Sequence, residues 1–243
     1  MIYFISDAHL GCRMMAEPAK HEKRLVDWLD MVKADASSIY MLGDMFDFWF
    51  EYSTVVPKGF VRFFGKMAEL VDSGIEINFF TGNHDIWTFG YLESEIGLKV
   101  YRKPQIVTLN DKIFYLAHGD EIYSATKKFG LLRKIFHNPT AQGIFAALPC
   151  SWGQKAGYAW SKNNRIKHLA SEIFQGEENE KQIIFAKELA RKNPEIQFFI
   201  FGHRHVDLDF QLDEQKHIVL LGDFIKRFSY GSFDGEKFTL KYF

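Results

Sequence analysis

Side chains that bind metals follow five apolar runs of this sequence. They occur in the motifs Asp7-Ala8-His9, Gly43-Asp44, Gly82-Asn83-His84-Asp85, His118-Gly119-Asp120 and Gly202-His203-Arg204-His205. Each motif contains a glycine or another small residue, which lets the chain turn sharply after the run. Carboxylate, imidazole and amide ligands suit Mn²⁺, Fe²⁺ or Zn²⁺, and a set without cysteine does not fit a thiolate zinc site.

The number of these side chains favours two cations over one. The candidate ligands are Asp7, His9, Asp44, Asn83, His118, His203 and His205. They are too many for one ion but suit two ions if one carboxylate bridges them. Two metals about 3.5–4 Å apart can hold both sides of an in-line displacement at phosphorus and lower the pKa of a shared water. We therefore expect hydrolysis of a phosphate ester or a pyrophosphate bond.

The apolar runs predict the elements that must position these ligands. Runs rich in β-branched and aromatic residues predict buried strands at Ile2–Ile5, Ile39–Leu42, Ile75–Phe80, Ile113–Ala117, Phe198–Phe201 and Ile218–Leu221. Helical spacing predicts two core-facing stripes, the first at Leu25, Trp28, Leu29 and Val32, and the second at Val61, Phe64, Ala68 and Val71, with Gly74 ending the second helix. Alternating strands and helices predict an α/β fold, in which the carboxyl ends of parallel strands line one crevice.

The pattern changes after Asp120. Residues 121–195 contain no convincing strand. Two amphipathic helices are predicted there, one by Phe129, Leu132, Ile135 and Phe136, the other by Ile166, Leu169, Ala170, Ile173 and Phe174. We interpret residues 121–195 as a helical insertion within a single domain of residues 1–243.

The insertion is basic and aromatic, although the whole chain has a formal net charge of −1. Residues 122–171 contain no Asp or Glu but eight cations, namely Lys127, Lys128, Arg133, Lys134, Lys155, Lys162, Arg165 and Lys167. Cations neutralise phosphate, and the interleaved aromatic side chains can cover acyl chains or rest in an anionic membrane interface. Alternatively, these cations form a solvated helix face that binds nothing. A surface of cations and aromatic rings would also bind nucleic acid.

The composition predicts a cytoplasmic protein. A hydrophobic content of 47% is ample for a packed core, and the two cysteines, Cys12 and Cys150, form no spacing pattern that predicts a disulfide. The first residues read as a strand without a basic leader, and no apolar stretch approaches the roughly 20 residues that span a bilayer. Peripheral contact with the inner face of the cytoplasmic membrane is our finer hypothesis.

The motifs resemble those of the calcineurin-like metallophosphoesterase superfamily, whose pattern is D-x-H, GD, GNH[DE], H and GH-x-H. The resemblance implies a sandwich of two mixed sheets flanked by helices, and two divalent metals, with Mn favoured over Fe or Zn. It implies that Asp7, His9, Asp44 and His205 hold one metal and that Asp44, Asn83, His118 and His203 hold the other. It also implies that His84 acts on the phosphate as general acid or transition-state stabiliser, oriented by Asp85.

The segment Gly43-Asp44-Met45-Phe46-Asp47-Phe48-Trp49 resembles GD-x-F-[DE]-x-W of UDP-2,3-diacylglucosamine hydrolases, the pyrophosphatases of lipid A biosynthesis. This closer resemblance implies attack at the α-phosphorus of a UDP-sugar lipid, which yields UMP and a diacyl sugar 1-phosphate. The best-known members have arginine where this chain has His84. The implied substrate contacts are Asn83, His84, Ser161, Lys162, Asn164, Arg165, Lys167 and His203.

Two other functions remain open. Histidine at position 84 is the general superfamily residue, which favours a soluble nucleotide or nucleic-acid phosphodiester as the alternative substrate, with nucleic acid the less favoured partner. A binding or scaffold protein that lost its chemistry is the second alternative, and the complete ligand set argues against it. We expect no obligate protein partner. Asp47 and Asp120 are expected to orient ligating imidazoles or to lie in turns.

Overall fold

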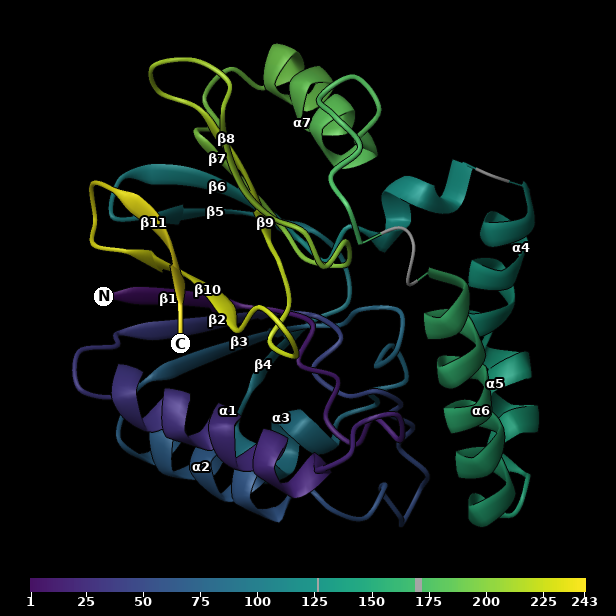
Figure 1. Ribbon diagram of the computed structural model, residues 1–243. Coiled ribbons are helices and arrows are strands. Elements are labelled where there is room, and N and C mark those ends of the chain that lie inside the picture. The colour runs from purple at the N-terminus through teal and green to yellow at the C-terminus, as the bar shows by residue number, and fades with distance from the viewer. Residues whose placement is uncertain (126, 169–171) are drawn as a thin grey trace.

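The computed structural model describes residues 1–125, 127–168 and 172–243, with side chains described except at 124–125, 127–129 and 165–168. Two mixed β-sheets lie face to face (Figure 1). The first has the order β11-β10-β1-β2-β3-β4 and comprises β1 (Ile2–Ile5), β2 (Ser38–Leu42), β3 (Glu76–Phe80), β4 (Lys99–Tyr101), β10 (Ser229–Phe233) and β11 (Phe238–Tyr242). The second has the order β5-β6-β7-β9-β8 and comprises β5 (Gln105–Leu109), β6 (Lys112–Ala117), β7 (Phe198–Phe201), β8 (Asp207–Gln211) and β9 (His217–Leu221). The predicted sandwich of two mixed sheets is confirmed.

All six predicted strands are present, with ends that agree to within one residue. They form two parallel sets, β1-β2-β3 in one sheet and β6-β7-β9 in the other. Strands of this kind are buried on both faces, so their sequences are continuously apolar. The strands that the sequence did not reveal are β4, β5, β8, β10 and β11, of which β5, β8, β10 and β11 pair antiparallel.

Apolar side chains fill three layers of the sandwich. Phe4, Phe114 and Ile200 belong to the cluster between the two sheets. On the outer face of the first sheet lie α1 (Pro18–Val32), α2 (Val61–Asp72) and α3 (Tyr91–Ile96), and on the outer face of the second lies α7 (Lys181–Lys192). Each large side chain buried in this way contributes about 1.5–3 kcal/mol, so these layers hold the strand ends rigidly.

The stripe predicted for α2 is displaced by one residue. Phe63, Met67 and Leu70 are the buried side chains of this helix, whereas Val61 is 77% exposed. Phe64, Ala68 and Val71 are half-buried at the border of the same cluster. Both sets repeat every three to four residues, so periodicity alone did not choose between them. Gly74 ends the helix as predicted, with φ of +89° and its N–H donating to Val71 O.

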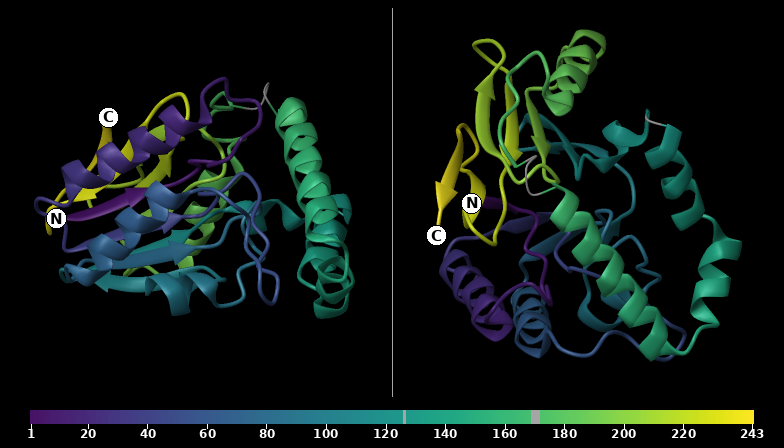
Figure 2. Two further views of the ribbon diagram at one scale, coloured as in Figure 1. Left: turned by 90° about the horizontal axis from the view of Figure 1, so that it is seen from below. Right: turned by 45° about the vertical axis from the view of Figure 1, so that its right-hand side comes forward.

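Three helices stand beside the sandwich at the carboxyl ends of the parallel strands (Figures 1 and 2). They are α4 (Lys127–Phe136), α5 (Pro139–Ala146) and α6 (Cys150–His168), and we call them the cap. A short 3₁₀ helix, η1 (Asp120–Ala125), precedes them. In contrast, α7 packs on the second sheet through Ile183 and Ala186. Only the first part of residues 121–195 therefore stands apart from the sandwich.

The second amphipathic helix predicted in the insertion ends earlier than the prediction placed it. Helix α6 ends at His168, and Ile173 and Phe174 lie outside any helix with exposed side chains. Leu169 and Ala170 lie outside the described residues. Among the helices that are described, none has the length and apolar composition needed to cross a bilayer.

Aromatic side chains join the cap to the sandwich. Phe48 packs against Phe145 of α5 and Tyr158 of α6, with ring centroids 6.3 and 5.8 Å apart. A Cβ on Gly157 would overlap the ring of Phe48, so glycine at this position lets α6 approach the sandwich closely. The cap is thereby held above the strand ends.

Candidate metal centre

The ends of five parallel strands bring the predicted ligands together. Among the residues that the structure describes, three groups of side chains offer ligand atoms within 4.8 Å of one another, namely Asp7 with His9 and His205, His9 with Asp44 and His84, and Asp44 with His118 and His203. Left-handed φ angles of 44° to 72° occur at Asp7, His9, Asp44, His203 and His205. Such angles are unfavourable for residues other than glycine and cluster at functional sites, where they direct side chains inward.

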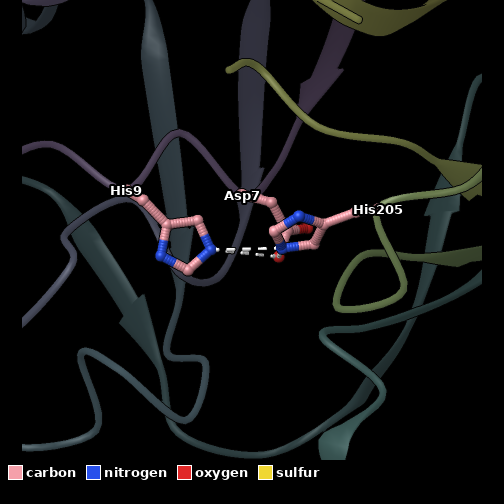
Figure 3. Close-up of side chains that lie close together, drawn as sticks. All are labelled: Asp7, His9 and His205. Carbon is pink, nitrogen blue, oxygen red and sulfur yellow. Dashed lines mark hydrogen bonds and ion pairs between the residues drawn. The ribbon is translucent and has the colours of Figure 1, made fainter. Parts of the chain in front are cut away.

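Asp7, His9 and His205 form the first group (Figure 3). Asp7 Oδ2 accepts a hydrogen bond of 2.8 Å from the backbone N–H of His203, which leaves Oδ1 to face the two imidazoles. Oδ1 lies 3.4 Å from His205 Nε2 and 3.8 Å from His9 Nε2. A fully buried carboxylate and two ring nitrogens thus point at one position.

Asp44 lies between this group and the second. Its Oδ2 is 3.8 Å from His9 Nε2 on one side and 3.3 Å from His118 Nε2 on the other. Asn83 Oδ1 is 3.4 Å from the same His118 nitrogen. The ring of His203 lies 5.1 Å from that of His118. All seven predicted ligands are therefore in one cluster, with Asp44 in the place that a bridging carboxylate would need.

Four imidazoles of the cluster turn Nδ1 outward to an oxygen atom. His118 Nδ1 lies 2.8 Å from Leu42 O, and His84 Nδ1 lies 2.8 Å from Asp47 O. A carbonyl oxygen only accepts, so in both rings Nδ1 carries a proton and Nε2 is the nitrogen that faces the cluster. Nδ1 of His9 and of His205 faces a carboxylate, Asp47 at 3.6 Å and Glu172 at 3.5 Å respectively. Metal-ligating histidines are held in this way.

The buried carboxylates of the cluster give it negative charge that a cation would neutralise. Asp7, Asp44 and Asp85 are buried together, and burying like charges is costly. Burial, followed by the nearby Asp44 carboxylate, raises the pKa of Asp85 to about 7. Burial alone would lower the pKa of His118, but Asp44 raises it well above its ordinary value. A divalent metal fits this donor set and would neutralise it.

Asp85 does not orient His84 as the resemblance implied. Its carboxylate accepts hydrogen bonds from the backbone N–H groups of Gly82 and Met45, at 2.7 and 2.8 Å. It therefore ties together the loops that follow β2 and β3. The partner of the His84 ring is the carbonyl of Asp47, a backbone group, and this is why the side-chain motif suggested the wrong partner.

The predicted substrate contacts on α6 differ in their environment. Ser161 is buried, and its Oγ has no hydrogen-bond partner among the described residues. Lys162 is exposed and Asn164 is half-buried. The side chains of Arg165 and Lys167 lie outside the described residues. The cap reaches the cluster through Trp160, whose ring centroid is 5.1 Å from that of His84.

An apolar cavity of about 200 Å³ opens beside Asn83 and His84. Its wall is shared by the sandwich and the cap, with Phe48, Ile86, Trp87, Phe136, Phe145 and Trp160 among its residues. The sequence does not reveal this cavity, because its halves come from segments distant in the chain. Glu172 was not predicted either, although the sequence carries a signal for it, since Glu172 is the first acid after the acid-free residues 122–171.

Residues 1–207 match the calcineurin-like phosphoesterase family. The chain belongs to this family. A UDP-2,3-diacylglucosamine hydrolase of Porphyromonas gingivalis is 44% identical to it over 252 residues, which cover 99% of this chain and 96% of the relative. Two hydrolases of the same name are 26% identical, one from Haemophilus influenzae (93% and 92% covered) and one from Actinobacillus succinogenes (91% and 90% covered). This calcineurin-like phosphoesterase is thus an enzyme whose aspartate and histidine cluster can hold divalent metals.

Proposed function

We propose that this phosphoesterase hydrolyses the pyrophosphate bond of UDP-2,3-diacylglucosamine, a step of lipid A biosynthesis, to give UMP and 2,3-diacylglucosamine 1-phosphate. The observation that carries the proposal is the apolar cavity that opens at Asn83 and His84. Acyl chains attached near the scissile phosphate would fill such a cavity, because ligand sites are apolar with few polar groups at one end. A soluble nucleotide has no comparable group. The similarity to hydrolases of this name over nearly the whole chain supports the same substrate.

The centre would hold two metals, with Mn²⁺ favoured and Fe or Zn as alternatives. Asp7, His9, Asp44 and His205 would hold one, and Asp44, Asn83, His118 and His203 the other. When bound, the metals lower the pKa of a water and stabilise charge on the phosphoryl oxygens.

The surrounding residues position and shield the reacting phosphate. His84 Nε2 lies 4.0 Å from Asp44 Oδ2, and its Nδ1–H is held by Asp47 O. His84 can therefore present Nε2 to the phosphate and, when protonated, donate a hydrogen bond to it in the transition state. Trp160 covers this imidazole from the side of the cap and limits the access of water. Ser161 Oγ, buried on the same helix, supplies a further polar group for the substrate head.

The cap would also contact the membrane that contains such a substrate. Leu131, Ile135, Ile144 and Trp152 are exposed on its helices, together with Lys134 and Lys155. Apolar side chains among cations, in a stretch without acids, suit the interface of an anionic membrane. This surface supports the proposal of a cytoplasmic protein in peripheral contact with the inner face of the cytoplasmic membrane.

The test is a comparison of substrates with the purified, Mn²⁺-loaded protein. UDP-2,3-diacylglucosamine in detergent micelles should release UMP, whereas a chromogenic phosphodiester and soluble UDP-sugars should react at least about 100-fold more slowly. In H₂¹⁸O the label should enter UMP and not the sugar phosphate, because the attack is at the α-phosphorus. Efficient cleavage of the soluble esters without UMP release from the lipid would support a soluble nucleotide substrate in its place.

A further inference from the structure

We propose that Glu172 is a positioning residue for the metal ligand His205, and that it couples the ligand loop to the segment that follows the cap. The inference rests on the proposed metal site. Glu172 Oε1 lies 3.5 Å from His205 Nδ1. On the other side of the same ring, Nε2 lies 3.4 Å from Asp7 Oδ1 and 3.3 Å from His9 Nε2. One edge of the ring thus faces the cluster and the other faces Glu172.

This carboxylate differs from the partners of the other imidazoles. His118 is held by the backbone carbonyl of the last residue of β2, and His84 by that of Asp47 in the loop after it. His9 faces the carboxylate of the same Asp47. These groups belong to the sandwich. Glu172 lies between α6 and α7, in the segment that returns from the cap. A carboxylate at Nδ1 makes the imidazole a stronger ligand and fixes the orientation of its ring.

The segment is fixed to the ligand loop at several points. Glu172 Oε2 accepts a hydrogen bond of 2.6 Å from Lys226 Nζ. The next carbonyl, Ile173 O, lies 3.4 Å from Nη2 of Arg204, the residue between His203 and His205. Arg204 also donates to Glu180 through Nε at 2.8 Å and Nη2 at 3.1 Å.

Both ends of residues 172–180 therefore contact the ligand loop, residues 202–205. The side chains of Arg204 and Glu180 are 9% and 1% exposed, so this ion pair is shielded from solvent. A shift of the segment would therefore move the loop that carries His203 and His205. Glu172 is the member of this network that touches a ligand ring directly.

The experiment measures Mn²⁺ binding to Glu172→Ala, Glu172→Gln and the control Glu177→Gln by competition with a chelator, with no substrate present. Glu177 lies in the same segment and pairs with Lys187, away from the cluster. Loss of an outer partner of a ligating histidine typically weakens metal binding about 10- to 100-fold. We expect Glu172→Ala to weaken one of the two Mn²⁺ equivalents by this factor. Glu172→Gln, which keeps an acceptor oxygen without the charge, should have an intermediate effect.

The metal-free melting temperature separates positioning from folding. It should fall by no more than about 4 °C in Glu172→Ala, because the Lys226 partner of the half-buried Glu172 is exposed and such an ion pair contributes only about 0–1 kcal/mol. The inference would be overturned if Glu172→Ala bound both Mn²⁺ ions with wild-type affinity, or if Glu177→Gln lost as much Mn²⁺ affinity as Glu172→Ala. It would also be overturned if the loss of Mn²⁺ affinity among the variants followed the loss of metal-free melting temperature. A wrong substrate assignment leaves this titration unchanged, whereas failure of the wild type to bind two metals would reject the site itself.

Discussion

The Nε2 atoms of His9 and His205 lie 3.3 Å apart, although the two residues are 196 positions apart in the chain. Two nitrogen ligands about 2.1 Å from one cation in tetrahedral geometry are separated by about 3.4 Å. Both rings also face Asp7 Oδ1 (Figure 3). The ends of β1 and β7 therefore present these three side chains in the spacing that ligands of one metal need.

Asp44→Asn should weaken both metals, because Asp44 Oδ2 faces His9 on one side and His118 on the other. An amide carries no charge to neutralise two cations. We expect elemental analysis to find less than one bound Mn²⁺ per chain. Activity should fall by at least about 100-fold, which is more than is typical when only a hydrogen-bond partner of a metal ligand is removed. Asp209→Asn is the matched control, since Asp209 pairs with His217 on β8 and β9. Full metal content in Asp44→Asn would contradict the bridging position.

His84→Gln should lower kcat and leave both metals bound. His84 Nδ1 is held by Asp47 O, and its Nε2 faces the cluster, 4.0 Å from Asp44 Oδ2. Removing a positioned acid or hydrogen-bond donor to a transition state typically costs about 10²- to 10³-fold in rate. His84→Arg should recover part of this loss, because arginine also donates. The measurement is steady-state kinetics beside metal analysis. Equal losses of metal and of rate would show that His84 acts only through the cluster.

Phe145→Ala should raise KM for the diacyl substrate. Phe145 lines the apolar cavity and contacts Phe48, Phe50 and Trp87. Loss of about 1.5–3 kcal/mol of apolar contact corresponds to an increase of about 10- to 100-fold. Hydrolysis of a soluble diester should change little. Val61→Ala removes an apolar side chain of α2 that is 77% exposed and does not line the cavity, so it serves as the control. Equal effects on lipid and soluble substrates would mean that the cavity does not bind acyl chains.

Glu121→Gln should change how stability depends on pH. Burial, followed by the neighbouring Asp120 carboxylate, raises the pKa of Glu121 from 4.5 to about 7. Between these values the folded protein holds a proton that the unfolded chain has released. The contribution of Glu121 to the free energy of unfolding is therefore full below pH 4.5 and is lost as the pH rises through 7.

Glutamine has no such titration, so Glu121→Gln should be more stable than the wild type at pH 8, by about 3 kcal/mol. The two proteins should differ little at pH 4. Urea unfolding of the metal-free proteins at both pH values measures this. A difference that is the same at pH 4 and pH 8 would show that Glu121 does not titrate with a raised pKa.

The sequence by itself determined the parallel strands and the set of candidate ligands. Strands β1, β2, β3, β6, β7 and β9 are buried on both faces, so their composition is continuously apolar and visible without a structure. Asp7, Asp44 and His118 lie just after the ends of such runs, and parallel strands end at the same side of a sheet. Strands with a half-exposed face, such as β5 and β8, carry no comparable signal.

Only the tertiary structure decided which groups surround the ligands. The partner of the His84 ring is a backbone carbonyl, which every residue has and no sequence pattern marks. Glu172 reaches His205, and Phe145 reaches Phe48, because the cap and its return segment pack on the strand ends. Such contacts depend on how distant segments pack together in space, whereas periodicity describes only the face that one segment turns toward its core.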